Sequence, residues 1–484
     1  EGRRGSADLV AYFFLRAWSL LRSGGGFGLL AVNTIAEGDT RQVGLEAMVG
    51  AGAVIHTAYP NEPWPGKAAV ITSRVHVHKG KWQGPRALLG RPVPFISAFL
   101  TEREEWSPKR LKATQNMAFV GSYVLGKGFV LSPDDAQRLL DADPRNQDVI
   151  FPYLSGEDVN SNPTHHPSRR VISFWDWSED KARSYKEPWR WIEEYVQPER
   201  QRLDENGGYV LRKPLPQRWW QYGDKRPALY HTIGRGYHFD QHPKDWDSTR
   251  EPHSDVLISA LVGKYFNPSV VPNNAIFNHK CIVFGGHRAN GLAALFNSSL
   301  VQAWVWQQSA RLKLDLSFSP SDAVETFPFL PDATIAHMER LGADYLEARR
   351  EFMVRHSFGV TKLYNRFHAP AEIDQSLTRL REMHREIDRF VAEAYGWDDL
   401  DLGHGFHEVP LHAEGDRTRF TIAEPVRVEV LLRFSELNRQ RYKQEVEAGL
   451  HQAPKKPTSR KKRSDHGAGD LFSADTAEME TVDD

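Results

Sequence analysis

The hydrophobic pattern of residues 8–80 predicts helices that alternate with strands. Apolar residues of the segment 8–22 recur on one helical face: Leu9, Phe13, Ala17, Leu20 and Leu21. Glycines at 24–26 supply the positive φ that ends such a helix. The apolar run 27–32 that follows is typical of a strand buried on both faces of a parallel sheet. A second helix and two further strands are predicted at 41–52, 53–60 and 68–80.

The order of these elements indicates one half of a Rossmann-like α/β domain over residues 1–88. The last two strands are expected to form a hairpin. Ligand chemistry in a sheet of this kind lies at the carboxyl ends of the strands. The polar loop that begins at Asn33 and Thr34 is therefore on the side of the sheet where function is expected.

After residue 88 the pattern changes. Short apolar segments alternate with Pro, Gly and Asn turns over 89–331, which favours a mixed α/β domain. Long amphipathic patterns over 332–450 predict a region of paired helices. The charged tail 451–484 lacks apolar content and is expected to be disordered. Its basic run, 455–463, fits either non-specific DNA binding or a solubilising role.

Composition excludes several classes of protein. The chain has 484 residues, 40% of them apolar and 26% charged, with a net charge of -1, so there is no chain-wide positive field. The single cysteine, Cys281, rules out an internal disulfide framework. No apolar run reaches the roughly 20 residues of a membrane span. A cytoplasmic protein without a membrane partner is therefore expected.

Local catalytic signatures are missing from the sequence, which contains no G-x-S-x-G pattern, no H-E-x-x-H pattern and no cysteine pair for zinc. His404 and His407 lie close to Glu408, a spacing that hints at metal binding. That stretch is rich in turn residues, however, and histidines commonly pack or cap. No metal site is therefore predicted.

Basic residues interleaved with aromatic and small polar residues mark candidate nucleic-acid contacts in three stretches. Cationic groups there would hold phosphates while polar neighbours read base edges. For the paired tryptophans, a position in the core or in an interface is the commoner role. The candidates are Arg169 and Arg170, then Trp219, Trp220, Lys225 and Arg226, and finally Arg311 and Lys313.

The order of nine stretches adds a resemblance that spans about residues 7–442. They include "GFGLLAVNTIAEGDT", "GSYVLGKGFVLSPDDAQRLL", "VIFPYLSGEDVNSNP", "WWQYGDKRPALY" and "LDLSFSPSDAVETFPF". In this order the stretches resemble the large adenine-specific DNA methyltransferases of bacterial restriction-modification and phage-defence systems. These are the Type IIL-like fused enzymes and the DISARM or BREX-type methylases. The resemblance implies an incomplete Rossmann-like methyltransferase sheet, a mixed α/β target-recognition domain over 89–331 and a helical C-terminal region.

Members of that family move a methyl group from S-adenosylmethionine to the N6 amine of an adenine that is flipped out of double-stranded DNA. The resemblance places their Asn-Pro-Pro-Tyr/Phe motif and their cofactor loop ahead of the helix that begins near Asp8. No Asn-Pro-Pro occurs in the sequence. Catalytic residues and most S-adenosylmethionine contacts are therefore expected upstream of Glu1, and this chain alone is expected to be inactive.

Two explanations account for the missing half of the methyltransferase domain. The chain is either a fragment of a longer enzyme or one polypeptide of a split enzyme, so the methyltransferase half would act in cis or in trans. Other defence-system subunits are further candidate partners. The resemblance assigns Asn33, Thr34 and Trp64 to the pocket of the target base, with loop stabilisation an equal alternative for Asn33 and Thr34. It assigns DNA contacts to Lys127, Arg169, Arg170, Lys225, Arg226, Arg311 and Lys313.

Two other functions remain open at this point. The first is a DNA-binding specificity module without chemistry, which the missing motif favours for the chain in isolation. The second is a sugar-binding or carbohydrate-active protein, suggested by the tryptophan-rich stretches "FWDW" and "RWW". The second function lacks an evident pair of carboxylates placed for glycoside chemistry.

Overall fold

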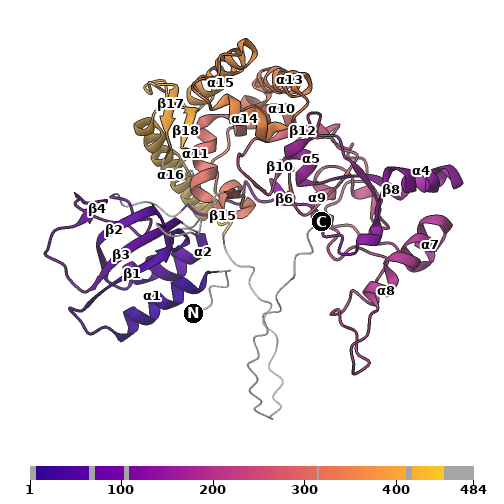
Figure 1. Cartoon of the computed structure of the whole chain (residues 1–484), viewed down its shortest axis with the longest axis horizontal. Coiled ribbons are helices and arrows are strands. Elements are labelled where there is room, and N and C mark those ends of the chain that lie inside the picture. The colour runs from indigo at the N-terminus through magenta and orange to yellow at the C-terminus, as the bar shows by residue number, and fades with distance from the viewer. Residues whose placement is uncertain are drawn as a thin grey trace.

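The computed structural model describes residues 7–36, 38–64, 71–102, 108–312, 315–409 and 417–451. Its buried apolar side chains form three clusters, and the chain is described below as an N-terminal region (7–102), a central region (108–284) and a C-terminal region (289–451), whose cluster also takes in side chains of the central region from Leu257 on. Figure 1 shows the N-terminal and central regions on opposite sides of the molecule, with the C-terminal helices above and between them. Among the described residues, no helix is both long enough and apolar enough to cross a lipid bilayer.

A five-stranded sheet, with the strand order β1-β3-β2-β4-β5, forms the N-terminal region. Strand β3 is antiparallel to both of its neighbours, so β1 and β2 run in the same direction on either side of it. The hairpin of β2 and β3 matches the predicted closing pair of strands. The elements are α1 (Leu9–Leu20), β1 (Gly26–Val32), η1 (Asn33–Ala36), α2 (Gly38–Arg41), η2 (Gln42–Glu46), α3 (Ala47–Gly50), β2 (Ala53–Pro63), β3 (Ile71–Lys79), β4 (Ala87–Leu88) and β5 (Arg91–Pro92).

Two predictions about this sheet are wrong in detail. Helix α1 turns Ala11 and Phe14 toward the sheet, whereas Leu9, Phe13 and Leu20 of the predicted apolar face are exposed. Strand β1 was expected to be buried on both faces, yet exposed and half-buried residues alternate along it. The reason is its position: β1 lies at the edge of the sheet, β3 is its one neighbour among the described strands, and α1 covers one of its faces.

The central region holds two four-stranded sheets, β13-β8-β9-β7 and β12-β10-β14-β6. The elements of these sheets and their connections are β6 (Ala118–Val120), η3 (Lys127–Phe129), β7 (Val130–Leu131), α4 (Pro133–Ala142), η4 (Pro144–Asp148), β8 (Ile150–Leu154), α5 (Gly156–Ser161), β9 (Arg169–Ile172), α6 (Glu179–Arg183), α7 (Lys186–Tyr195), α8 (Gln197–Arg200), α9 (Pro227–Thr232), η5 (Gly236–His238), β10 (Asp255–Ala260), β11 (Val262–Gly263), β12 (Ser269–Pro272), β13 (Ile276–Phe277) and β14 (Cys281–Phe284).

The second of these sheets joins two cores. On β10 and β14, Leu257, Ile282 and Phe284 belong to the C-terminal cluster, while Val256 and Val283 belong to the central cluster. Side chains alternate between the two faces of a strand, so this sheet is packed on both sides. The central and C-terminal regions therefore form one packed body.

Long helices make up most of the C-terminal region. Helices α13 and α15 confirm the predicted paired helices, and α16 lies in the same predicted region. The C-terminal cluster begins at Leu257 and so crosses the predicted domain border at residue 331, while the tail lies outside the described residues. The elements are α10 (Ala289–Asn297), α11 (Ser299–Gln308), β15 (Ala310–Leu312), β16 (Asp315–Ser317), η6 (Pro320–Val324), α12 (Asp332–His337), α13 (Glu339–His356), α14 (Val360–Phe367), α15 (Gln375–Ala394), β17 (Gly405–Glu408), β18 (Thr418–Thr421) and α16 (Glu424–Glu447).

Candidate nucleic-acid interface

Three loops that are distant in the sequence meet on the central region. The loop after β6 forms one backbone bridge at Ser122 to Asn278 and another at Tyr123 to Asp224. The Tyr123 N–H donates to the Asp224 carbonyl over 3.0 Å, and the Asp224 N–H returns a bond to the Tyr123 carbonyl over 3.1 Å. Gly121 makes this approach possible, because a Cβ atom there would overlap the carbonyl oxygen of Asn278. The three loops are therefore held as one platform.

Aromatic rings and a cation lie on this platform. The rings of Tyr123 and His279 stack with their centres 4.6 Å apart, and the Arg226 guanidinium lies 5.1 Å from the centre of the Tyr123 ring. The Nε atom of Arg226 is 3.3 Å from a carboxylate oxygen of Asp224. Burial lowers the pKa of His279, with Lys280 contributing in the same direction. The His279 ring is thus an uncharged stacking partner at neutral pH.

The backbone of Arg226 is unusual, because its φ of 53° lies in the left-handed region that residues with a side chain seldom adopt. Its N–H donates to the Asp224 carboxylate over 2.9 Å, which holds the turn. Left-handed backbone costs about 1 kcal/mol and is often found where a side chain is held for a function. This turn fixes the Arg226 guanidinium next to Tyr123.

A second arginine, Arg169, is linked to the platform by Tyr153. The Arg169 guanidinium lies 5.8 Å from the centre of the Tyr153 ring. The Tyr153 hydroxyl accepts a hydrogen bond from Asn278, the residue before His279. We call the continuous set formed by Arg169, Tyr153, Asn278, His279, Tyr123 and Arg226 the cation–aromatic stripe.

The remaining predicted DNA contacts are placed differently. Arg170 and Lys127 are exposed, on β9 and at the start of η3. Lys225 is half-buried and donates to Gln221 over 3.0 Å, and burial followed by the nearby Arg218 lowers its pKa. The side chain of Arg311 and the whole of Lys313 lie outside the described residues.

Trp219 and Trp220 are buried in the central core. Trp219 packs against Trp189 with ring centres 4.8 Å apart, and the Trp220 indole N–H donates to the Trp177 carbonyl over 3.1 Å. Neither ring is open to DNA, so the core role is the correct one of the two that the sequence left open. The stretch "FWDW" is likewise buried, which leaves the tryptophan-rich stretches without an open ring face for a sugar.

Sequence reasoning missed Tyr123, Tyr153, Asn278 and His279. Tyr123 and Tyr153 lay in stretches already singled out, whereas Asn278 and His279 lay in none, and nothing local distinguishes the four from ordinary turn or core residues. What brings them together is the pair of bridges between loops, and this is a tertiary feature. Only the knowledge of which loops contact one another would have identified these residues.

The candidate base-pocket residues follow the carboxyl ends of β1 and β2, at the same end of the N-terminal sheet. Asn33 follows the carboxyl end of β1 and is buried, while Trp64 follows the carboxyl end of β2 and is exposed. Residues Val32 and Glu62 both pair with Thr72, so these two strand ends lie one strand apart on either side of β3. The Thr34 hydroxyl is 3.4 Å from the carboxylate of Asp8, which caps α1.

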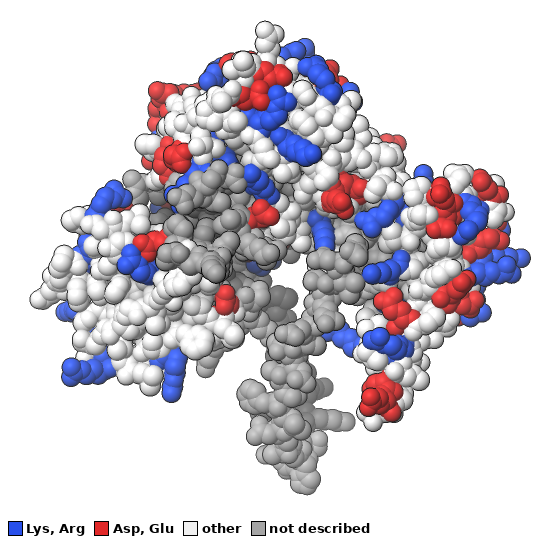
Figure 2. Space-filling view, viewed as in Figure 1, with Lys and Arg blue, Asp and Glu red and all other residues white. Residues whose placement is uncertain are grey.

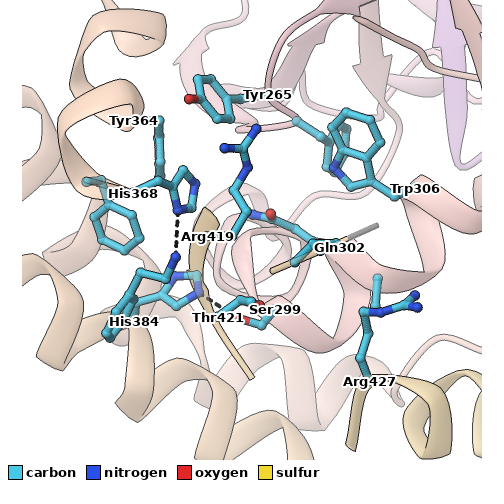
Figure 3. Close-up of a pocket in the computed structure, with 15 residues that line it drawn as sticks. Tyr265, Ser299, Gln302, Trp306, Tyr364, His368, His384, Arg419, Thr421 and Arg427 are labelled. Atoms are coloured by element: carbon cyan, nitrogen blue, oxygen red, sulfur yellow. Dashed lines mark hydrogen bonds between the residues drawn. The ribbon is translucent and has the colours of Figure 1, made fainter. Parts of the chain in front are cut away.

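A separate cavity of about 50 Å³ lies in the C-terminal region between α11, α14, α15, β18 and α16 (Figure 3). At its wall the Ser299 hydroxyl lies 2.8 Å from Nε2 of His384, whose pKa is lowered by burial. The buried Asp388 accepts the Ser299 N–H over 2.6 Å and lies 2.8 Å from Nε2 of His404. Among the described residues no group of His, Cys, Asp and Glu could hold a metal ion. His404 is joined through Asp388 to Ser299 in one hydrogen-bond network.

Comparison with solved structures shows the fold. A structure of the Type IIL restriction-modification enzyme MmeI in complex with DNA matches 90% of this chain with a TM-score of 0.63 and 14% sequence identity. The chain spans about half of that protein, 52% of its length. At this identity the likeness establishes a shared mixed α/β fold with small sheets and a helical C-terminal region.

A structure of the type IIG restriction endonuclease BpuSI is also similar in part, over 81% of this chain and 50% of that one, with 10% identity. Its TM-score of 0.27 is too low to support an argument. No protein-family model and no curated protein matches the sequence.

Proposed function

We propose that this chain is the DNA-recognition part of a restriction-modification enzyme that methylates adenine N6 with S-adenosylmethionine. The cation–aromatic stripe is the observation that carries the proposal, since it lies on a fold shared with an enzyme solved in complex with DNA. Figure 2 shows Lys and Arg side chains, with Asp and Glu among them, on the side of the central region that faces the N-terminal region. Duplex DNA is proposed to bind along this side of the central region.

The chemistry of the stripe supports recognition of base pairs as well as phosphates. An arginine held in one orientation can donate two hydrogen bonds to a guanine, and a carboxylate accepts from the amine of cytosine. Arg226 and Asp224 offer both groups side by side, 3.3 Å apart. Arg169 adds a cation for a phosphate contact. The stacked pair of Tyr123 and His279 gives Arg226 a rigid support.

Methyl transfer is proposed to need residues outside this chain. The carboxyl ends of β1 and β2 carry Asn33, Thr34 and Trp64, and Glu62 beside them is paired with Arg74 over 2.6 Å. This set lacks the glycine-containing loop and the Asn-Pro-Pro motif that hold S-adenosylmethionine and the adenine in the family resembled. The residues present therefore do not fit the cofactor by themselves. Their proposed role is to border the target base once the other half of the sheet is in place.

A binding measurement with the chain alone tests the recognition part of the proposal. Gel shifts with a pool of duplexes of randomised sequence at low salt should show binding, and repeated selection should enrich one short sequence. Arg226→Gln should weaken binding of the enriched duplex about tenfold or more. Arg169→Gln should mainly reduce the salt dependence, by about one phosphate contact.

Arg340→Gln is the matched control, because Arg340 is an exposed arginine on α13, away from the stripe. It should leave binding unchanged. Absence of binding to any duplex at low salt would contradict the proposal, and so would an equal loss in the Arg340 variant.

A second candidate function is a specificity module that binds DNA without any chemistry. The absence of an Asn-Pro-Pro motif from the 484 residues favours it for this chain taken alone. Producing the chain together with its upstream coding sequence separates the two functions. Adenine methylation of the host DNA would support the methyltransferase, whereas binding without methylation would support the module.

A further inference from the structure

Leu125, two residues after Tyr123 of the cation–aromatic stripe, has an unusual backbone. Its φ of 48° lies in the left-handed region, which a bulky residue seldom adopts. Gly126, the next residue, also has a positive φ, of 146°. Asparagine or aspartate can stabilise left-handed backbone through its own polar side chain, but leucine cannot. The conformation of Leu125 is therefore imposed by its surroundings.

Hydrogen bonds to the two preceding residues hold this backbone. Tyr123 and Asp224 exchange two backbone hydrogen bonds across the bridge between their loops. The Val124 carbonyl accepts a hydrogen bond over 2.9 Å from the guanidinium of Arg200, which is buried. The chain thus enters Leu125 from a segment that is fixed on the platform.

The Leu125 side chain is nevertheless open to solvent, with 46% of its surface exposed. It lies over Gly223, where a Cβ atom would overlap it. Gly223 directly precedes Asp224, whose carboxylate is 3.3 Å from Nε of Arg226. An exposed leucine gains little from packing, yet its left-handed backbone carries a steric cost. Such strain is often found where a side chain is held for a function.

We propose that Leu125 contacts the C5 methyl group of a thymine in the recognised DNA sequence. This inference rests on the proposed function, in which Arg226 and Asp224 read base edges in the major groove. Among the four bases, thymine presents a methyl group in that groove, and proteins read it through apolar side chains. Leu125 supplies an apolar group beside the two hydrogen-bonding ones. Because its backbone is already fixed, little freedom is lost when DNA binds.

A wedge between base pairs is the other role of an exposed leucine at a DNA interface. A wedge acts on the stacking of a base step and does not depend on one methyl group. A leucine that contacts thymine depends on that methyl group alone. The two roles therefore differ in their response to uracil, which is thymine without the C5 methyl group.

The experiment uses the full chain and the duplex enriched by selection, with each thymine replaced by uracil in turn. At one position the replacement should weaken binding by the parent chain about fourfold, the effect of losing one buried methyl group. Leu125→Gly should bind the thymine and uracil duplexes equally. Glycine adopts a positive φ without steric cost. The variant should therefore fold, and its midpoint of thermal unfolding should not fall by more than about 2 °C.

Leu89→Gly is the matched control. Leu89 is also a left-handed leucine, with a φ of 53° and 49% exposure, but it lies in the N-terminal region between β4 and β5. This variant should keep the parent chain's preference for thymine at the same position.

The outcomes separate this inference from the proposed function. Selective binding in which no uracil replacement matters, or an enriched sequence without A·T pairs, overturns the role of Leu125 and leaves recognition by Arg226 intact. A thymine preference that survives in Leu125→Gly also overturns it. Weaker binding of that variant to every duplex, with the uracil effect unchanged, would assign Leu125 to a wedge. Failure of the parent chain to bind any duplex overturns both proposals.

Discussion

The central region and the N-terminal region differ in how far their own residues cover their apolar side chains and pair their backbone groups. Around the cation–aromatic stripe, backbone bridges join the loops. Its two arginines and the rings of Tyr123 and His279 are half-buried, and Tyr153 is buried. In the N-terminal region, Leu9, Phe13 and Leu20 of α1 are exposed, and β3 is the one described strand that pairs with β1. The difference indicates that contacts between its own loops hold the surface of the central region, whereas α1 and β1 leave apolar side chains uncovered by the described residues.

The largest expected effect comes from a comparison of substitutions on the buried and the exposed side of α1. Phe14 is fully buried and packs on Phe27, with ring centres 5.7 Å apart, while the neighbouring Phe13 is mostly exposed. Phe14→Ala should lower the free energy of unfolding of the N-terminal region by about 3–5 kcal/mol, because it leaves a cavity. Phe13→Ala in the chain alone should change it by less than about 0.5 kcal/mol. Chemical denaturation of both variants measures the contrast, and equal losses would mean that Phe13 is covered within the chain.

A smaller effect is expected when the glycines of the two regions are compared. A Cβ at Gly121 would overlap backbone oxygens of the platform, which cannot move without breaking the loop bridges. Gly121→Ala should therefore lower the free energy of unfolding by about 3 kcal/mol and reduce DNA binding. A Cβ at Gly28 would lie 2.7 Å from the ring of His76, which can rotate away. Gly28→Ala should cost less than about 1 kcal/mol, and thermal unfolding of the two variants provides the measurement.

Acid should destabilise the packed body formed by the central and C-terminal regions. Burial, with Arg235 adding to it, lowers the pKa of His238 to about 3, and burial lowers the pKa of His165 to about 4. Between these values and the ordinary 6.5, the unfolded chain binds protons that the folded chain does not. The contribution of these two histidines to the free energy of unfolding is therefore fully present above pH 6.5. It is lost as the pH falls, by at most about 1.4 kcal/mol per pH unit for each histidine.

The variant His238→Phe isolates one of these groups. A phenyl ring can keep the stack on Trp175, in which the two rings lie 4.4 Å apart and nearly parallel. Denaturation at several pH values should show a shallower loss of stability below pH 6.5 than in the parent chain. His337→Gln, a change at an exposed position, is the control. An unchanged slope in the His238 variant would mean that His238 takes up its proton in the folded chain.

The sequence predicted the helices and strands better than the residues that pack against them. Amphipathic repeats over several turns identified α13 and α15, because the period itself reports which side is buried. The apolar residues of α1 were also recognised, but a pattern does not state what covers them, and the predicted face proved to be the outward one. Arg169 and Arg226 were selected by residue type. Their partners Tyr153 and Tyr123 were not, since contacts between distant loops leave no local pattern.

The smallest expected effect concerns Thr34, for which the sequence left two roles open. Its hydroxyl lies 3.4 Å from the Asp8 carboxylate in an exposed position, and Asp8 also accepts the Val10 N–H at the start of α1. Loss of such a bond in Thr34→Ala should lower the free energy of unfolding by about 0.5 kcal/mol, and Thr34→Ser should restore it. Denaturation of the chain alone measures this. If Thr34 instead borders the target base, Thr34→Ala should reduce adenine methylation by the completed enzyme far more than so small a loss of stability explains. A variant that changes stability and leaves methylation intact would assign Thr34 to the cap of α1.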